Sequence, residues 1–184
     1  MSPPIWVLFG SGSVKEVFTF QTDLSNLDTL RSTLKEIEQV GPLGLVYHNA
    51  ARIRRTEALT TPPEEIEDDF RTGNLSLYVI AQWAIPLLQA SDHPAPSFFV
   101  TNSHLPEAPL PEVLSLSMSK ASQQNMFMSL NKAFGKDIHF GLVKACGIVA
   151  PTKEKLNPSF IAGKAVELYE QERAKWELSV EIRE

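Results

Sequence analysis

The sequence predicts an α/β fold in which helices flank a Rossmann-like parallel sheet. Short runs of apolar residues alternate with longer stretches in which apolar residues recur at helical spacing. Strands that are apolar throughout are typical of parallel sheets covered on both faces. The length of 184 residues suits one compact domain over residues 1–184, and no linker or internal repeat divides it.

Two strands and a helix are expected at the start of the chain. Residues 5–9 are apolar and lie between a Pro pair and a Gly/Ser-rich segment, and residues 17–20 form a second apolar run. Residues 23–26 then supply a turn and a helix N-cap. From residue 27 apolar residues recur at helical spacing until Gly41 and Pro42 end the helix.

The remaining elements continue the alternation of strands and helices. The sequence predicts strands over residues 43–47, 97–101, 140–143 and 178–182. It predicts helices that begin after an N-cap at Thr61 and decline at Pro86, that span residues 114–134, and that span residues 159–176. Gly73 is a weak point in the first of these helices.

Composition excludes several classes of function. Seventeen basic and 22 acidic residues give a net charge of -5 without a basic cluster, which argues against nucleic acid as a partner. Cys146 is the only cysteine, and the four histidines show no metal-ligand spacing, so no metal site is expected. No apolar run reaches the roughly 18 residues of a membrane span. We expect a cytoplasmic protein that does not bind membranes.

Polar segments follow the predicted strands where a ligand would bind. In open parallel sheets the ligand crevice lies at the carboxyl ends of the strands. Residues 10–13, Asp23, residues 48–51, residues 103–104 and residues 146–148 all lie at such ends. Polar loops follow the strands of any α/β protein, so this placement alone leaves the function open.

The order of these residues resembles the short-chain dehydrogenase/reductase family from about Val17 to the C-terminus. The resemblance is carried by Asp23 before a helix, by His48-Asn49-Ala50-Ala51 in place of the family's Asn-Asn-Ala-Gly turn, by Asn74, Ser103 and Lys120, and by Cys146-Gly147. It implies an oxidoreductase that uses NAD(P) to interconvert a carbonyl and an alcohol on a small molecule. Such proteins also occur in metabolite-tailoring pathways, which is an association at the level of fold.

The resemblance also implies roles for individual residues. Ser103 would steady the developing oxyanion, Lys120 would bind the ribose and assist proton transfer, and Asn74 would hold a relay water. The implied cofactor-binding residues are Gly10 and Gly12 in a glycine-rich turn, Asp23 at the adenine, and Asn49, Lys120, Ile148 and Thr152.

The first departure from the family pattern removes its proton donor. The family has a tyrosine four residues before its lysine, and Leu116 stands at that position. A leucine has no proton to give, and loss of a positioned general acid costs about 10² to 10⁴ in rate. One interpretation is that His104 or Ser117 replaces the tyrosine as proton donor. The alternative is that His104 is an ordinary loop histidine and Ser117 an ordinary surface serine.

The second departure is a missing βα layer. Only residues 12–16 separate the first two strands, whereas one parallel crossover needs roughly a dozen residues. No helix N-terminus then follows Gly10 and Gly12 to hold a pyrophosphate, so this segment is either a remnant of the glycine-rich turn or a plain connection. We expect an antiparallel hairpin or a loosely held first segment.

Three interpretations of the chain stay open. It is an impaired or atypical oxidoreductase, or a pseudoenzyme that binds a ligand or partner, or the product of an incomplete gene. The family commonly packs as dimers or tetramers through the two long helices, which implies the same here.

Arg52, Arg54 and Arg55 form either a solvated basic loop or an anion clamp near the crevice.

Overall fold

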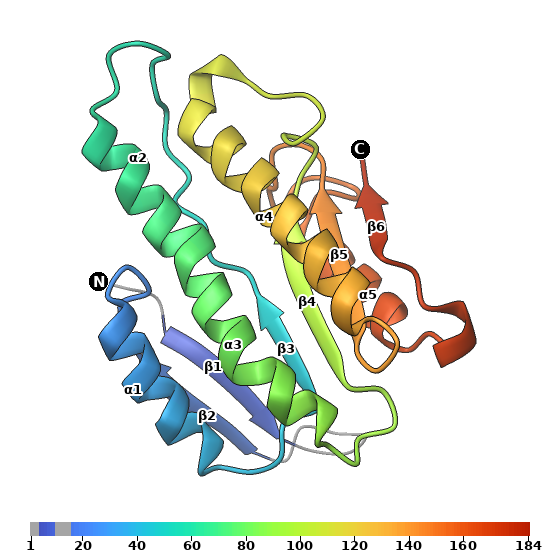
Figure 1. Cartoon of the computed structure of the whole chain (residues 1–184). Coiled ribbons are helices and arrows are strands. Elements are labelled where there is room, and N and C mark those ends of the chain that lie inside the picture. Colours follow the sequence, from blue (N-terminus) through green and yellow to red (C-terminus); the bar gives the residue numbers. More distant parts are fainter. Residues whose placement is uncertain (1–3, 10–15) are drawn as a thin grey trace.

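A parallel sheet of four strands forms the centre of the molecule. The computed structural model describes residues 4–9 and 16–184. The parallel sheet has the order β3-β4-β5-β6, and Figure 1 shows it beside a separate antiparallel pair, β1-β2. The strands are β1 (Pro4–Phe9), β2 (Glu16–Gln21), β3 (Leu45–His48), β4 (Ser97–Asn102), β5 (His139–Ala145) and β6 (Ser179–Ile182).

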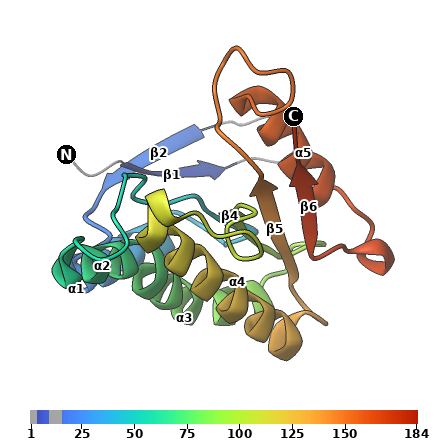
Figure 2. The ribbon, with the colours of Figure 1, turned by 90° about the horizontal axis from the view of Figure 1, so that it is seen from above.

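Helices lie on both faces of this sheet, as the sequence predicts. Figure 2 shows α1 (Leu27–Glu38), α2 (Pro63–Phe70), α3 (Ser76–Gln89) and α4 (Leu114–Phe134) on one side and α5 (Pro158–Tyr169) on the other. The larger hydrophobic cluster lies under α1, α3 and α4, and the smaller one under α5. The predicted α/β class and parallel sheet are confirmed.

Alternation along β4 divides its side chains between the two clusters. Successive residues of a strand point to opposite faces of the sheet. Phe98 belongs to the larger cluster, where its ring centroid lies 5.9 Å from that of Phe127 and 6.0 Å from that of Phe140. Phe99 belongs to the smaller cluster. Both sides of β4 are therefore fixed by packing, which holds its carboxyl end in place.

The first two strands form an antiparallel hairpin, which is one of the two arrangements that the short connection allows. Ile5 lies opposite Phe20 and Phe9 opposite Glu16 in the register. No hydrogen-bonded ladder joins the hairpin to β3 within the described residues. Gly10 and Gly12, the expected glycine-rich turn, lie outside those residues.

The helix expected between Thr61 and Pro86 is interrupted by a π-turn, Arg71–Leu75, which separates α2 from α3. The prediction that Thr61 is the N-cap of this helix is wrong. Its hydroxyl donates to the Glu57 carbonyl oxygen at 2.8 Å, and Pro62 takes the cap position without a side-chain bond. Pro86 lies inside α3, which continues to Gln89.

The predicted boundaries of the other elements hold to different degrees. The helix over residues 114–134 is confirmed, and β3 begins two residues later than expected. The last helix ends at Tyr169 rather than Trp176, because Gln171 and Glu177 exchange two hydrogen bonds that turn the chain back. No helix among the described residues is long and apolar enough to cross a membrane.

Candidate active site

Asn102, the last residue of β4, links two of the predicted catalytic residues. Its Oδ1 accepts a hydrogen bond from Ser103 N at 2.7 Å, and its Nδ2 donates to the Lys120 carbonyl oxygen on α4 at 3.2 Å. The Ser103 Oγ accepts from Leu105 N at 3.2 Å, which leaves the hydroxyl proton for another partner. Ser103 therefore has the geometry of a donor at the carboxyl end of the sheet.

The amine of Lys120 lies beneath this end of the sheet. Its Nζ donates to the Thr101 carbonyl oxygen at 2.8 Å and to Gln123 Oε1 at 3.1 Å. Only 6% of the Lys120 surface is exposed, and burial lowers the pKa of its amine to about 8. The lysine is therefore close to Ser103, but its amine faces protein oxygens.

Asn74 joins this cluster from the π-turn. Its Nδ2 donates to the Ser119 carbonyl oxygen at 3.1 Å, and its Oδ1 accepts from the Ser119 hydroxyl at 2.5 Å. Gly73 is required beside it, because a Cβ there would lie 2.8 Å from Ser119 Oγ. The structure thus brings Asn74, Ser103 and Lys120 together, with both polar atoms of the Asn74 amide engaged by α4.

Of the two residues considered as substitute proton donors, His104 lies in a loop as expected, and Ser117 is placed differently. Ser117 is buried, so its interpretation as a surface serine is wrong. Its Oγ accepts from Leu110 N at 3.2 Å and donates to the Leu110 carbonyl oxygen at 3.4 Å, which ties it to the loop before α4. His104 has a buried Nδ1 with no partner among the described residues. Leu116 lies half-buried one turn before Lys120.

His48 brings a buried imidazole to the end of β3. Its Nε2 lies 3.4 Å from Ser76 Oγ, and Ser76 donates its own proton to the Thr72 carbonyl oxygen at 2.5 Å. The Nε2 therefore carries the hydrogen, and Nδ1 is an acceptor without a partner among the described residues. Burial, and then the charge of Lys120, lower the His48 pKa to about 3. The ring is neutral at physiological pH.

The expected adenine end of the site lies at the carboxyl ends of β2 and β3. Asp23 is exposed after β2, and Asn49 is exposed after β3. Hydrogen bonds from the Ser25 hydroxyl and backbone N–H lower the Asp23 pKa, and the charge of Arg52 lowers it further. The effect of Arg52 indicates that the loops carrying Asp23 and Asn49 lie near each other.

Two of the three arginines after β3, Arg52 and Arg54, form ion pairs with α2, so these two are neither solvated nor a free anion clamp. Arg52 lies 3.2 Å from Asp68, and Arg54 lies 3.0 Å from Glu65. Both also lie 3.4 Å from the buried carboxylate of Asp69. Arg55 is exposed. These pairs fix the loop after β3 against α2.

The loop after β5 stands apart from this cluster. Ile148 is 82% exposed, Thr152 is exposed, and no hydrogen bond in the described part of the chain joins either to Asn74, Ser103 or Lys120. Burial raises the Cys146 pKa, which fits a small apolar side chain rather than a nucleophile.

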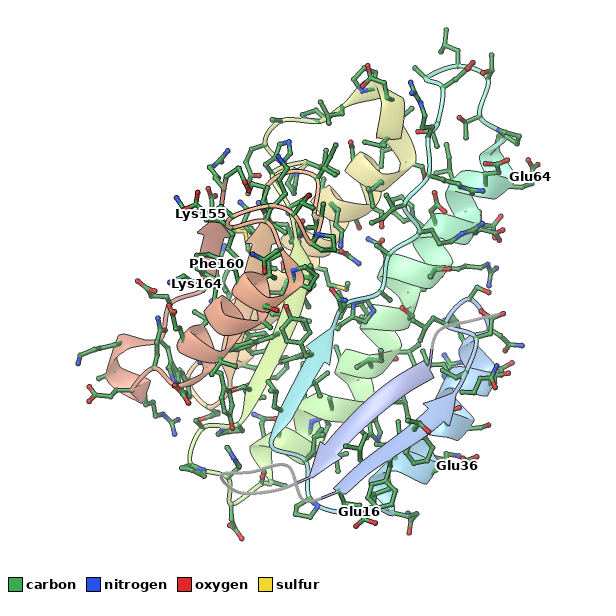
Figure 3. The ribbon with its side chains drawn as sticks, turned by 180° about the vertical axis from the view of Figure 1, so that it is seen from behind. Glu16, Glu36, Glu64, Lys155, Phe160 and Lys164 are labelled. Atoms are coloured by element: carbon green, nitrogen blue, oxygen red, sulfur yellow. The ribbon has the colours of Figure 1, made fainter. Side chains whose placement is uncertain are left out.

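A separate cavity of about 780 Å³ lies between α5 and β6. Figure 3 shows Lys155, Phe160 and Lys164 gathered at one end of α5. The Lys164 Nζ lies 5.7 Å from the Phe160 ring centroid and pairs with Glu167. Neither Ser103 nor Lys120 lines this cavity, so it is not the candidate site.

Comparison with known proteins was informative only at the level of structure. No family model and no curated protein sequence matches the chain. A short-chain dehydrogenase from Rhodopseudomonas palustris is similar with a TM-score of 0.78 at 19% identity, over 91% of this chain and 74% of that chain. The chain has the fold of the short-chain dehydrogenases.

Two further structures share the short-chain dehydrogenase fold. An alcohol dehydrogenase from the archaeon Thermococcus sibiricus, complexed with 5-hydroxy-NADP, has a TM-score of 0.76 at 15% identity, covering 86% of this chain and 71% of that one. A protein from Escherichia coli CFT073 assigned as a short chain dehydrogenase has a TM-score of 0.62 at 20% identity, over 70% of this chain. The match spans 57% of that longer protein.

Sequence reasoning missed Gln123 and Ser119, the two α4 residues that hold Lys120 and Asn74. The spacing contained a signal for them. Residues 116, 119, 120 and 123 recur at intervals of three and four, so they share one face of the helix. Polar residues on a helix face that packs against a sheet point to a hydrogen-bond network.

Proposed function

We propose that the chain is a divergent member of the short-chain dehydrogenase/reductase family, an oxidoreductase with impaired turnover that uses NAD(P) on a carbonyl or alcohol of a small molecule. The observation that carries the proposal is the cluster of Asn74, Ser103 and Lys120 at the carboxyl end of β4. The structural neighbours with bound NADP or NAD support the choice of cofactor.

The residues fit a dinucleotide in part. Asp23 and Asn49 are exposed along the expected adenine side, and Ser103 retains a proton to donate. When bound, the nicotinamide supplies or accepts a hydride. Ser103 would then orient the substrate oxygen, and Lys120 would bind the ribose, which would compete with Gln123 and Thr101 for its amine. Asp23 would meet the adenine.

Impairment follows from Leu116. The side chain one turn before Lys120 offers no proton, and the Ser117 hydroxyl is held by Leu110. We expect the absence of this donor to cost about 10² to 10⁴ in rate.

The second candidate function is a pseudoenzyme that binds a ligand or partner. The burial of the Lys120 amine and the engagement of Asn74 by Ser119 favour it.

Titration with NADPH and NADH tests the proposal. We expect one of them to bind in the micromolar range, measured by the change in its fluorescence and by thermal shift. Asp23→Ala should weaken binding. Asp28→Ala should not, because among the described residues the Asp28 side chain pairs with its helix neighbour Arg31 and not with the candidate site. A flat response with both dinucleotides would exclude the oxidoreductase and leave the pseudoenzyme.

We also propose that copies of the chain pair through the outer surface of α3 and α4. Figure 1 shows α3 and α4 side by side in front of the sheet. Tyr78 is 48% exposed on α3, and Met118 and Met128 are each 42% exposed on α4. An apolar patch over two adjacent helices suits an interface between two copies.

A further inference from the structure

Gln123 connects the π-turn to the amine of Lys120. Its side chain is 0% exposed in the centre of the contact between α4 and the π-turn. The Gln123 Nε2 donates to the Gly73 carbonyl oxygen at 2.7 Å, and its Oε1 accepts from Lys120 Nζ at 3.1 Å. One amide therefore satisfies both a backbone carbonyl of the π-turn and a buried cation.

The bond to Gly73 fixes the direction of the Gln123 amide. An amide group has one donor side and one acceptor side. Because the donor side is held by the π-turn, the acceptor side must face Lys120. A rotation of the amide would place an N–H group against an ammonium and an oxygen against the Gly73 carbonyl, so both contacts would become repulsive.

The Lys120 amine is consequently held on the inner side of β4. Among the described residues, its acceptors are Gln123 Oε1 in a buried bond and the Thr101 carbonyl oxygen in a part-buried bond. Asn102 and Ser103, which follow Thr101, mark the carboxyl end of the strand, where a dinucleotide would bind. A ribose bound there would compete with Gln123 and Thr101 for the amine, which donates to both.

We propose that Gln123 is a positioning residue that holds Lys120 withdrawn beneath the end of β4, so that a bound dinucleotide competes with Gln123 for the amine. This inference rests on the proposed function only where it concerns contact between Lys120 and a bound dinucleotide. The withdrawn position itself is a property of the protein without ligand, and can be measured without activity.

Chemical labelling of lysines tests the positioning. Wild type, Gln123→Met and the matched control Gln124→Met are treated with limiting acetic anhydride, and the rate at each lysine is measured by mass spectrometry. Methionine has the length of glutamine, but its thioether sulfur is only a weak acceptor for the Lys120 hydrogen bond. Gln124 is the adjacent residue on α4 and bonds to Glu107 instead.

We expect Lys120 to react about tenfold faster or more in Gln123→Met than in wild type, because a hydrogen bond to a charged group is lost. Gln124→Met should leave the rate unchanged. Lys144, whose side chain is 8% exposed, reports general loosening, and its rate should stay constant. An unchanged Lys120 rate in Gln123→Met, or an equal rise at Lys144, would overturn the proposal.

NADPH titration of the same variants separates this inference from the proposed function. We expect Gln123→Met to bind NADPH more tightly than wild type. The gain in affinity should not exceed the ratio of the Lys120 labelling rates of the two proteins. If wild type and variant both fail to bind, the proposed function is wrong, and the labelling rate still decides the role of Gln123. Gln123→Met could instead label faster at Lys120 and yet bind NADPH more weakly than wild type. That result would show that Gln123 holds Lys120 in its productive position, contrary to the proposal.

Discussion

At the scale of one residue, Leu116 stands at the position where the family that the sequence resembles has a tyrosine. It lies on α4 one helical turn before Lys120, so its side chain and that of the lysine share a helix face. The position is half-buried, so a larger side chain there would be partly exposed to solvent. A hydroxyl carried there would lie on the same side of α4 as Lys120.

Leu116→Tyr should therefore raise turnover. We expect an increase of about 10² to 10⁴ in NADPH oxidation with a panel of small aldehydes and ketones, since a positioned acid contributes that factor. Leu116→Phe, which has the ring without the hydroxyl, should not increase it. Equal rates for the two variants would show that the remaining groups no longer form a working site.

His48 makes stability depend on pH at the same scale. The unfolded chain takes up a proton at this ring below about pH 6.5, whereas the folded protein resists protonation until about pH 3. Acidification through this window therefore favours the unfolded state, by about 5 kcal/mol at most. His48→Asn should flatten the fall in unfolding free energy over this window, measured by urea denaturation. An unchanged slope would mean that the folded protein accepts the proton.

At the scale of elements, the π-turn between α2 and α3 decides how closely α4 can approach. The extra residue of a π-turn leaves a backbone carbonyl without its usual helix partner. Here the Gly73 carbonyl receives the Gln123 amide, and Asn74 projects to Ser119. The contact depends on Gly73 having no side chain.

Gly73→Ala should destabilise the protein by about 1 to 3 kcal/mol, the range for overpacked sites. The new Cβ would lie 2.8 Å from Ser119 Oγ and 3.3 Å from Gln123 Nε2. Gly163→Ala is the control in α5, because nothing lies within 4 Å of its Cβ position. There we expect stabilisation by about 0.5 to 1 kcal/mol from higher helix propensity. Urea unfolding midpoints measure both, and a neutral Gly73→Ala would contradict the close packing.

At the scale of the whole molecule, the two faces of the sheet are covered unequally. The helices α1, α3 and α4 bury the larger cluster, whereas α5 covers mainly β5 and β6. Leu45 and Tyr47 of β3 remain 38% exposed. On the side of the larger cluster, the outer surface of α3 and α4 is the proposed site of pairing between copies.

Met118→Lys should weaken this pairing and shift the chain toward monomer, because a charge would be buried at the interface. Val166→Lys places the same change on α5, outside the proposed interface, and should have no effect. Sedimentation velocity at several concentrations measures the distribution. A wild type that sediments as a monomer at every concentration would exclude the interface.

The sequence by itself determined the α/β class and the helix over residues 114–134, and it left two arrangements of the first segment, of which the structure has the antiparallel hairpin. The choice of Asn74, Ser103 and Lys120 came from the resemblance to a family and not from spacing. Apolar periodicity and connection length are local quantities, so they can be read along the chain. Only the tertiary structure decided that Thr61 does not cap α2, that Arg52 and Arg54 pair with α2, and that Ser117 is buried. The withdrawn position of Lys120 belongs with these, because it depends on a glutamine amide oriented by the carbonyl of Gly73, 50 residues away in the chain.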